Sequence, residues 1–345
     1  MGEAINTLAQ SGTSNFSNNP DSEKKVLCGA GSELGDKKAW KGRAKRKTIA
    51  QALNLSLIEA VEKKGEPERK QAYRNAYYCQ IRVFSHEGRV YGKYCKSRSC
   101  PICCSIRKAQ IINRYLPIVR TWKDPFFVTL TVKAVPASKL KRWMFGFQKA
   151  FRQIREKLKK QYQRGGGVQL VGIKSLECNF NATKKTYNPH FHLIVSSEAV
   201  ADVLIREWQL KWTKKHTSPL AQHKRRVRSP EKDLIETIKY GSKIFTDPDV
   251  KQKGKYPAMV YASALDNILE AMKPYRLFER FGFNLPKEER QTEEKSVFED
   301  QCEAWVFDRS ANDWINPETS EKLTGFAPPS QLLWLLSQNM DTEAQ

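Results

Sequence analysis

Apolar and polar residues follow strand-like and helix-like patterns in turn between residues 126 and 245. Three runs, at 126–132, 168–180 and 189–196, are rich in β-branched and aromatic residues and predict strands. A polar turn at 181–188 separates the last two runs, so we expect those strands to pair as a hairpin.

Helical periodicity fills the gaps between these strands. Residues 138–160 place large apolar side chains three and four positions apart, which predicts an amphipathic helix with Ser138 as its N-cap. Residues 199–215 predict a second helix. A third is expected to run from Ser229 and Pro230, which favour an N-cap and the first helical position, to about residue 245. Alternating strands and helices indicate a mixed α and β domain.

Two histidines, His190 and His192, lie one residue apart on the last of these strands. Side chains alternate across a strand, so both imidazoles point to one face while Phe191 points to the other. The chain has only five histidines. The pair therefore indicates a metal site, although two histidines on a half-exposed strand also occur without a metal.

A third ligand for this site is expected from the neighbouring strand. Glu177 lies on the predicted hairpin partner, which would bring its carboxylate close to His190 and His192. Two imidazoles and a carboxylate suit Mg²⁺ or Mn²⁺ bound together with water or phosphate oxygens. An exposed strand carboxylate is the alternative interpretation of Glu177.

The third predicted helix carries a candidate nucleophile. Glu236 and Tyr240 are four residues apart and so lie next to each other on one helical surface. A tyrosine hydroxyl has a pKa of about 10 and needs activation, which a metal on the phosphate and Lys239 or Lys243 nearby would supply. Glu236 would act as a base for a later attack by water or a hydroxyl. The alternative is a tyrosine that only packs its ring, beside an ordinary Glu–Lys pair.

Cysteines cluster in a second candidate site. The chain has eight, and four of them fall between Cys95 and Cys104. Cys100 and Cys103 have the spacing of a zinc knuckle, and Cys95 with Cys79, which lies across an apparent hairpin, would complete a tetrahedral Zn²⁺ site. The residues leave open whether Cys79 or Cys104 is the fourth ligand, and a cysteine-rich apolar turn is the alternative.

The overall charge points to a polyanionic partner. Lys and Arg number 60 against 37 Asp and Glu, which gives a net charge of +23. The sequence contains no apolar run of the roughly 20 residues that span a bilayer, and the polar start of the chain lacks the apolar core of a signal peptide. We therefore expect a cytoplasmic protein that binds nucleic acid and not membrane, with the basic run 224–228 as one contact region.

Charge also separates the end of the chain from the rest. Residues 285–345 contain five Lys and Arg but thirteen Asp and Glu. This acidic segment is expected to be a solvated appendage, with a protein-binding segment or a brake on DNA binding as alternatives. Trp305 and Trp314 indicate a hairpin within it.

Taken in order, these motifs resemble the rolling-circle plasmid replication initiators of the HUH endonuclease superfamily. The resemblance spans roughly residues 77–285. It rests on the run Phe127–Thr131, Glu177, Pro189–His192, Glu236 with Tyr240, and the segment Cys95–Cys103, which is similar to that of a single-tyrosine bacterial branch. Many relatives carry a further histidine where this chain has Asn188.

The resemblance implies a fold and a mechanism. It implies an α+β nuclease domain in which the histidine strand is central in an antiparallel sheet flanked by helices, preceded by the cysteine-rich zinc module. Tyr240 would nick one strand at an origin hairpin, leaving a 3′-OH and a 5′-phosphotyrosine, and Glu236 would promote termination. A host helicase and a DNA polymerase are the implied partners. The implied DNA-contacting residues are Arg98, Lys224, Arg225, Arg226 and Arg228.

Four regions are expected along the chain. They are a flexible arm at 1–37, a basic and cysteine-rich DNA-binding region at 38–120, the endonuclease domain at 121–285, and an acidic extension at 286–345. A transposase or relaxase with the same core is an enzymatic alternative, and a zinc-dependent DNA-binding protein without catalysis is a non-enzymatic one. Transposases of this superfamily commonly use two tyrosines in one helix, whereas the helix here has only Tyr240.

Overall fold

The computed structural model describes residues 35–238, 258–286, 301–330 and 332, together with three two-residue strands at 25–26, 32–33 and 297–298. Within these residues the fold is mixed α and β, and every strand pair is antiparallel. The predicted fold class, an α+β protein with antiparallel sheets flanked by helices, is confirmed.

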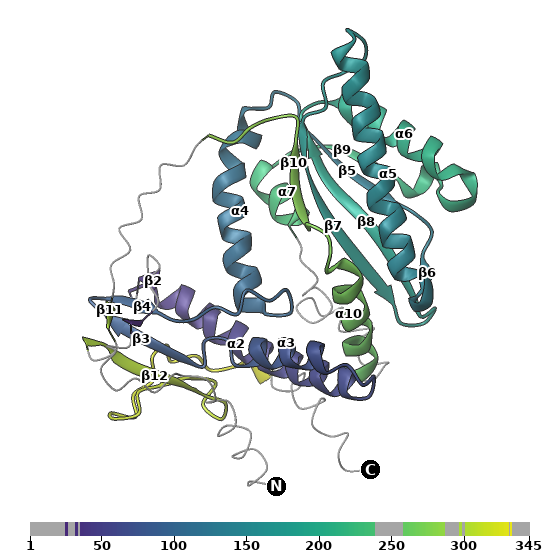
Figure 1. Cartoon of the computed structure of the whole chain (residues 1–345). Coiled ribbons are helices and arrows are strands. Elements are labelled where there is room, and N and C mark those ends of the chain that lie inside the picture. Colours follow the sequence, from purple (N-terminus) through teal and green to yellow (C-terminus); the bar gives the residue numbers. More distant parts are fainter. Residues whose placement is uncertain are drawn as a thin grey trace.

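The larger sheet carries the histidine strand at its centre (Figure 1). Its strands lie in the order β10, β7, β8, β5 and β9, with the short β6 beside β8. Their bounds are Phe278–Phe281 for β10, Gly172–Asn181 for β7, Thr186–Val195 for β8, Phe126–Thr131 for β5, His223–Arg226 for β9 and Val135–Pro136 for β6. The predicted hairpin forms from β7 and β8, and β5 pairs with β8 on the other side.

Helices cover both faces of this sheet. On one face lie α5 (Ala137–Gln163) and α6 (Glu198–His216), and Phe191 packs between them against Phe147 and Trp208. On the other face lie α4 (Pro101–Thr121) and α7 (Pro230–Thr237) (Figure 1). Because Phe191 is buried under α5 and α6, its neighbours His190 and His192 must point toward the face of α4 and α7.

A second sheet forms beside two long N-terminal helices. It contains β2 (Ser32–Glu33), β4 (Arg89–Tyr91), β3 (Arg82–His86), β12 (Glu303–Asp308) and β13 (Asp313–Ile315). The helices are α2 (Lys37–Glu62) and α3 (Pro67–Tyr77), and a separate pair of strands joins β1 (Lys25–Val26) to β11 (Val297–Phe298). The hairpin expected around residues 79–95 is therefore present as β3 and β4.

Part of the acidic segment packs into this second sheet. Strand β12 pairs with β3, and the buried rings of Trp305, Phe307 and Trp314 form a small core with Trp40 of α2. The indole N–H of Trp314 donates to the carbonyl of Gln80 at 2.8 Å. Residues 303–315 are therefore built into the fold, which corrects the interpretation of the whole segment as a solvated appendage. The expected Trp305–Trp314 hairpin forms from β12 and β13.

Helix α10 (Ala258–Met272) connects the two halves of the structure (Figure 1). Its fully buried Asp266 accepts a hydrogen bond from the Tyr73 hydroxyl at 2.7 Å and pairs with Lys64 at 2.7 Å and Arg69 at 3.2 Å. Asp266 therefore anchors α10 to α2 and α3. The same helix contacts α5, which lies on the sheet.

Two predicted local features differ in the structure. Helix α5 begins at Ala137 after an extended Pro136, so Ser138 lies inside the helix and does not cap it. The basic run 224–228, which has no strand-like pattern in the sequence, overlaps β9, whose residues pair with β5. By contrast, Ser229 caps α7 as predicted, and Pro230 is the first residue of that helix.

Candidate metal centres and nuclease site

The carboxylate of Glu177 lies next to both imidazoles. Glu177 is in register with His190, and its Oε2 is 3.5 Å from Nε2 of His190 and 3.7 Å from Nε2 of His192. Glu177 and His190 are only 5% exposed, and the side chain of His192 is 13% exposed. Three ligand atoms from two neighbouring strands therefore converge on one point below α7.

Hydrogen bonds at the far nitrogens fix how the imidazoles are turned. Nδ1 of His190 donates to the carbonyl oxygen of Asn188 at 3.1 Å, and Nδ1 of His192 lies 3.1 Å from the Thr129 hydroxyl. Because a carbonyl oxygen only accepts, the proton of His190 is on Nδ1 and its lone pair is on Nε2, the atom that faces Glu177. The Thr129 hydroxyl can accept from Nδ1 of His192 in the same way. Partners of this kind set the tautomer of metal-binding histidines and strengthen them as ligands.

This donor set fits a divalent ion. Atoms that share one ion at about 2.1 Å lie roughly 3.0 to 4.2 Å apart, and the measured separations of 3.5 and 3.7 Å fall in that range. The buried carboxylate of Glu177 also places negative charge where a cation would compensate it. Glu177, His190 and His192 would be the residues that hold the ion.

Asn188 lies where the resemblance to the initiators led us to expect a further histidine. Its side-chain amide donates to the carbonyl of Val132 at 2.7 Å, and its amide oxygen accepts from the Thr131 hydroxyl at 3.1 Å. Asn188 therefore ties β8 to the end of β5, next to the metal-ligand set. In this chain, Asn188 thus helps to hold the histidine strand β8 in position against β5.

Helix α7 carries Glu236 on the same side of the sheet as the histidines. The Asp233 carboxylate on this helix accepts a hydrogen bond from Arg225 of β9, which raises the pKa of Arg225, and Glu236 adds a smaller contribution. The Arg225 guanidinium lies 4.6 Å above the ring of Phe127, and that ring is 5.3 Å from the imidazole of His192. A connected set of side chains thus links α7 to the histidine pair.

Two of the residues assigned to catalysis, Tyr240 and Lys243, lie outside the described part of the chain. Helix α7 ends at Thr237 and is followed by Ile238, whose side chain is buried. Glu236 is half-buried in the last turn of the helix.

Four cysteines form a second cluster. The sulfur atoms of Cys79, Cys95, Cys100 and Cys103 all lie within 4.8 Å of one another, and Sγ of Cys103 is 3.7 Å from that of Cys79 and 3.6 Å from that of Cys95. A tetrahedron of sulfurs bound to Zn²⁺ at about 2.3 Å has edges of about 3.8 Å. The sulfur positions therefore fit Zn²⁺. Cys104 points elsewhere and donates to the carbonyl of Arg98 at 3.3 Å.

Hydrogen bonding among the four thiols acts on them in opposite directions. Contacts with Cys100, Cys79 and Cys95 lower the pKa of Cys103, whereas contacts with Cys103, Cys79 and Cys95 together with burial raise the pKa of Cys100. The fully buried Lys47 of α2 donates to the carbonyls of Tyr77 at 2.7 Å and Cys79 at 2.8 Å, and burial lowers its pKa to about 8. Sequence reasoning missed Lys47, because it belongs to a basic run that is typical of a solvated helix face.

The residues predicted to contact DNA are largely held by protein partners. Arg98 donates to the carbonyls of Met272 at 2.7 Å and Tyr275 at 2.8 Å, at the end of α10. Lys224 pairs with Glu198 and Asp202, and Arg226 pairs with Asp124. Arg225 is bound to Asp233, and Arg228 is exposed.

The family model that matches this chain describes a replication protein and covers residues 89–305. The chain belongs to this family of replication proteins. The match runs from β4 to the start of β12 and includes the larger sheet with its histidine pair. It also includes Cys95, Cys100 and Cys103 of the cysteine cluster, whereas Cys79 lies before it. It confirms the resemblance to replication initiators that the ordered motifs indicated.

Relatives with the name "Protein rep" agree with this family. One from Bacillus amyloliquefaciens is 29% identical over 47% of the chain and 49% of its own length. Another, from Streptococcus pneumoniae, is 30% identical over 47% of the chain and 50% of its own length, and a third, from Bacillus sp., is 32% identical over 30% of the chain and 33% of its own length. The chain thus spans about half the length or less of these curated relatives.

No solved structure matches the chain. Within the described residues, no helix combines the length and apolar character needed to cross a membrane.

Proposed function

We propose that this replication protein is a plasmid rolling-circle initiator that nicks one strand of DNA at the origin. The observation that carries the proposal is the convergence of Glu177, His190 and His192 on one point, with both Nε2 atoms directed inward by bonds at Nδ1. This centre lies under α7, the helix after which Tyr240 follows in the sequence. The "Protein rep" relatives and the net charge of +23 support DNA as the substrate.

The proposed reaction is a transesterification. The Tyr240 hydroxyl loses its proton and attacks the phosphorus of the scissile phosphodiester. The bond from phosphorus to the 3′ oxygen breaks, and that oxygen takes up a proton. The products are a 5′-phosphotyrosine on the protein and a free 3′-OH, from which a polymerase extends. In this proposal Lys243 assists the ionisation of Tyr240, and Glu236 serves as the base in the later step that ends a round.

Glu177, His190 and His192 hold Mg²⁺ or Mn²⁺ in this proposal. The ion supplies Lewis-acid polarisation of a phosphoryl oxygen. The four cysteines hold Zn²⁺ as a structural ion, which fixes the segment 95–100 against the start of α4. The protein would act in the cytoplasm on a hairpin or single strand of plasmid DNA, together with a host helicase and a polymerase.

A transposase or relaxase would use the same core, and a zinc-dependent DNA-binding protein would use only the cysteine cluster. The stretch 230–245, which the sequence predicts as one helix, contains a single tyrosine, and this favours the initiator over a transposase with two tyrosines in one helix. The convergent donor set favours an enzyme over a protein that only binds DNA, because a structural zinc module has no need of Glu177, His190 and His192 at one point.

The test is nicking of supercoiled plasmid that carries the cognate origin, with Mn²⁺ or Mg²⁺. We expect Tyr240→Phe to abolish nicking and the covalent protein–DNA adduct seen on a denaturing gel, with origin binding close to wild type. His192→Ala should abolish nicking at low metal concentration. Undiminished cleavage by Tyr240→Phe would overturn the proposed function, and adduct formation by wild type in excess chelator would overturn the metal centre.

A further inference from the structure

A groove of about 600 Å³ lies between α4 and the start of β10. Three segments contribute to it: the loop between Cys95 and Cys100, one face of α4, and the residues that lead from α10 into β10. The lining residues are Lys96, Arg98, Arg107, Gln110, Ile111, Arg114, Tyr115, Arg276, Leu277 and Phe278. Five of these ten carry a positive charge and none a negative one, so an anion is the complementary ligand. We call it the α4 groove.

Two of the five charged groups of the α4 groove are oriented by backbone carbonyls. Arg98 donates to the carbonyls of Met272 and Tyr275, and Arg107 donates to the carbonyl of Lys96 at 2.9 Å. Lys96, Arg114 and Arg276 are exposed at the rim. The positions of Arg98 and Arg107 are therefore set before an anion binds, which limits the entropy that these two side chains lose on binding.

The floor of the α4 groove is apolar. Tyr115 and Leu277 are buried there, and the half-buried Phe278 contacts the Tyr115 ring edge-on at 4.9 Å between centroids. A positive rim over an apolar, aromatic floor is the pattern of single-strand binding sites, in which phosphates meet cations and bases meet apolar side chains. A duplex keeps its bases stacked inside and presents phosphates outside, so it would leave this floor unused.

Register places the groove beside the candidate nuclease site. Phe278 of β10 is paired with Ser175 of β7, and Ser175 is paired with His192 of β8. Residues paired in this way share a face of the sheet, and the groove thus opens on the face that carries the histidines. Two strand spacings separate Phe278 from His192, which is about 10 Å. A short run of nucleotides would connect the two sites.

We propose that the α4 groove binds the single-stranded DNA that adjoins the scissile phosphate. The inference deepens the proposed function and rests on it for the identity of the strand that is cut. It also gives the zinc cluster a role, because Cys95 and Cys100 flank Lys96 and Arg98 and so hold one wall of the groove.

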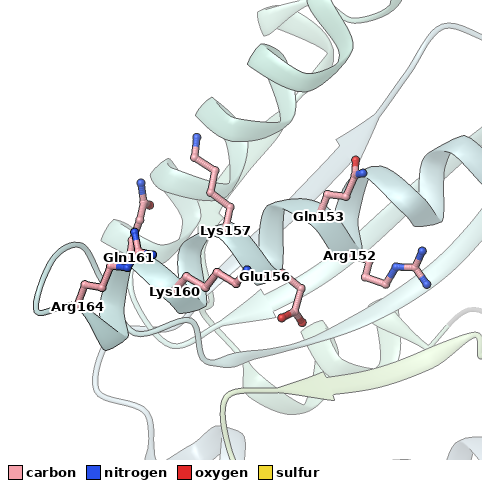
Figure 2. Close-up of a pocket in the computed structure, with 7 residues that line it drawn as sticks. All are labelled: Arg152, Gln153, Glu156, Lys157, Lys160, Gln161 and Arg164. Carbon is pink, nitrogen blue, oxygen red and sulfur yellow. The ribbon is translucent and has the colours of Figure 1, made fainter.

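The test compares charge reversal in the groove with the same change elsewhere. The groove variant is Arg114→Glu with Arg276→Glu. The control is Arg152→Glu with Arg164→Glu, two exposed residues of a pocket on α5, on the other side of the sheet (Figure 2). Binding of a fluorescent single strand of about 16 nucleotides and mixed sequence is measured by anisotropy without metal, over a series of salt concentrations. Melting temperature and zinc content check that each variant is folded.

We expect the groove variant to bind the strand at least about 10-fold more weakly, and the slope of log K against log salt to fall by about 1.4 for two lost phosphate contacts. The control should stay close to wild type. Equal losses in both variants, or no loss in the groove variant, would overturn the proposal. The proposal would also be overturned if the groove variant bound a duplex of the same length more weakly but bound the single strand as tightly as wild type. A strand with 5-iododeoxyuridine should crosslink to peptides that contain Tyr115 or Phe278, and crosslinks confined to α5 would contradict the groove.

The outcome separates this proposal from the proposed function. Binding of a mixed-sequence strand without metal does not depend on Tyr240. Cleavage by Tyr240→Phe would overturn the nicking mechanism and leave the groove result standing. Normal strand binding by the groove variant would overturn the groove and leave the nicking result standing.

Discussion

The hydroxyl group of Thr129 lies 3.1 Å from Nδ1 of His192. The two residues are direct partners across β5 and β8, and the contact leaves Nε2 of His192 facing Glu177. Thr129 belongs to the apolar run Phe127–Thr131 that first suggested a buried strand. Its position therefore contributes to the sheet and to the candidate metal centre at once.

Removal of this hydroxyl should weaken metal binding. We expect Thr129→Val to lower Mn²⁺ affinity by about 10- to 100-fold, because the imidazole loses the partner that orients it. Nicking should fall at limiting Mn²⁺ and recover at high Mn²⁺. Calorimetric titration with Mn²⁺ measures the change, and Thr129→Ser, which keeps the hydroxyl, is the matched control. Equal Mn²⁺ affinity in the valine and serine variants would contradict a role for the hydroxyl in orienting His192.

Cys103 and Cys104 should respond differently to the same substitution. Cys103→Ser should lose the zinc ion, melt at a lower temperature and bind single-stranded DNA more weakly, since the loop that carries Lys96 is no longer held. Cys104→Ser should keep its zinc, because Cys104 bonds to the carbonyl of Arg98 and lies outside the cluster. To compare the two variants, a thiol reagent releases the bound zinc and a colorimetric chelator measures its amount per chain. Full zinc content in Cys103→Ser would show that the cluster does not bind zinc through this residue.

These two cysteines also illustrate the limits of sequence reasoning. The spacing of Cys100 and Cys103 indicated zinc, but the sequence left open whether Cys79 or Cys104 was the fourth ligand. Neighbouring residues on a helix point about 100° apart, so α4 can direct only one of Cys103 and Cys104 toward the cluster. Cys79 lies between α3 and β3, and the β3–β4 hairpin, which the sequence indicated, brings it to the cluster. The direction in which α4 points Cys103 and Cys104 depends on how that helix packs, which the spacing of the cysteines does not show.

Strands rich in apolar residues were predicted, and a strand without them was not. β8 was predicted because its residues are rich in β-branched and aromatic side chains, and the geometry of a strand then placed His190 and His192 on one face. β9 has the sequence His-Lys-Arg-Arg and no apolar alternation. It forms because β5 offers an open edge and because Asp124, Asp202 and Asp233 compensate its charges. Asp124 is distant along the chain from Arg226, whereas Asp202 and Asp233 are 22 and 8 residues from Lys224 and Arg225.

Alkaline pH should weaken the anchor between Tyr73 and Asp266. Burial, followed by the nearby carboxylate, raises the pKa of Tyr73 above the value of about 10 for a free tyrosine. A group with a raised pKa stabilises the fold fully below its unfolded pKa, and this contribution is lost as the pH rises toward the folded pKa. The difference in free energy of unfolding between wild type and Tyr73→Phe should therefore shrink above about pH 10, by up to about 1.4 kcal/mol per pH unit.

Urea unfolding of both proteins between about pH 8 and pH 11 measures this difference. Tyr162→Phe is the control, because Tyr162 is 46% exposed on α5 and takes no part in the contact with Asp266. A difference between wild type and Tyr73→Phe that stays constant across this range would contradict the assignment. α10 would then be anchored to α2 and α3 mainly by the pairs of Asp266 with Lys64 and Arg69.

Glu236 should affect the end of a replication round and not the first cut. We expect Glu236→Ala to nick supercoiled plasmid at close to the wild-type rate, because the proposed nucleophile Tyr240 and the ligands His190 and His192 are unchanged. The covalent adduct should persist, since the base for the second step is missing. Gel quantification of adduct and released product over time measures both steps. Glu231→Ala, on the exposed first turn of the same helix, is the control. Loss of the first cut in Glu236→Ala alone would instead assign Glu236 to the activation of Tyr240.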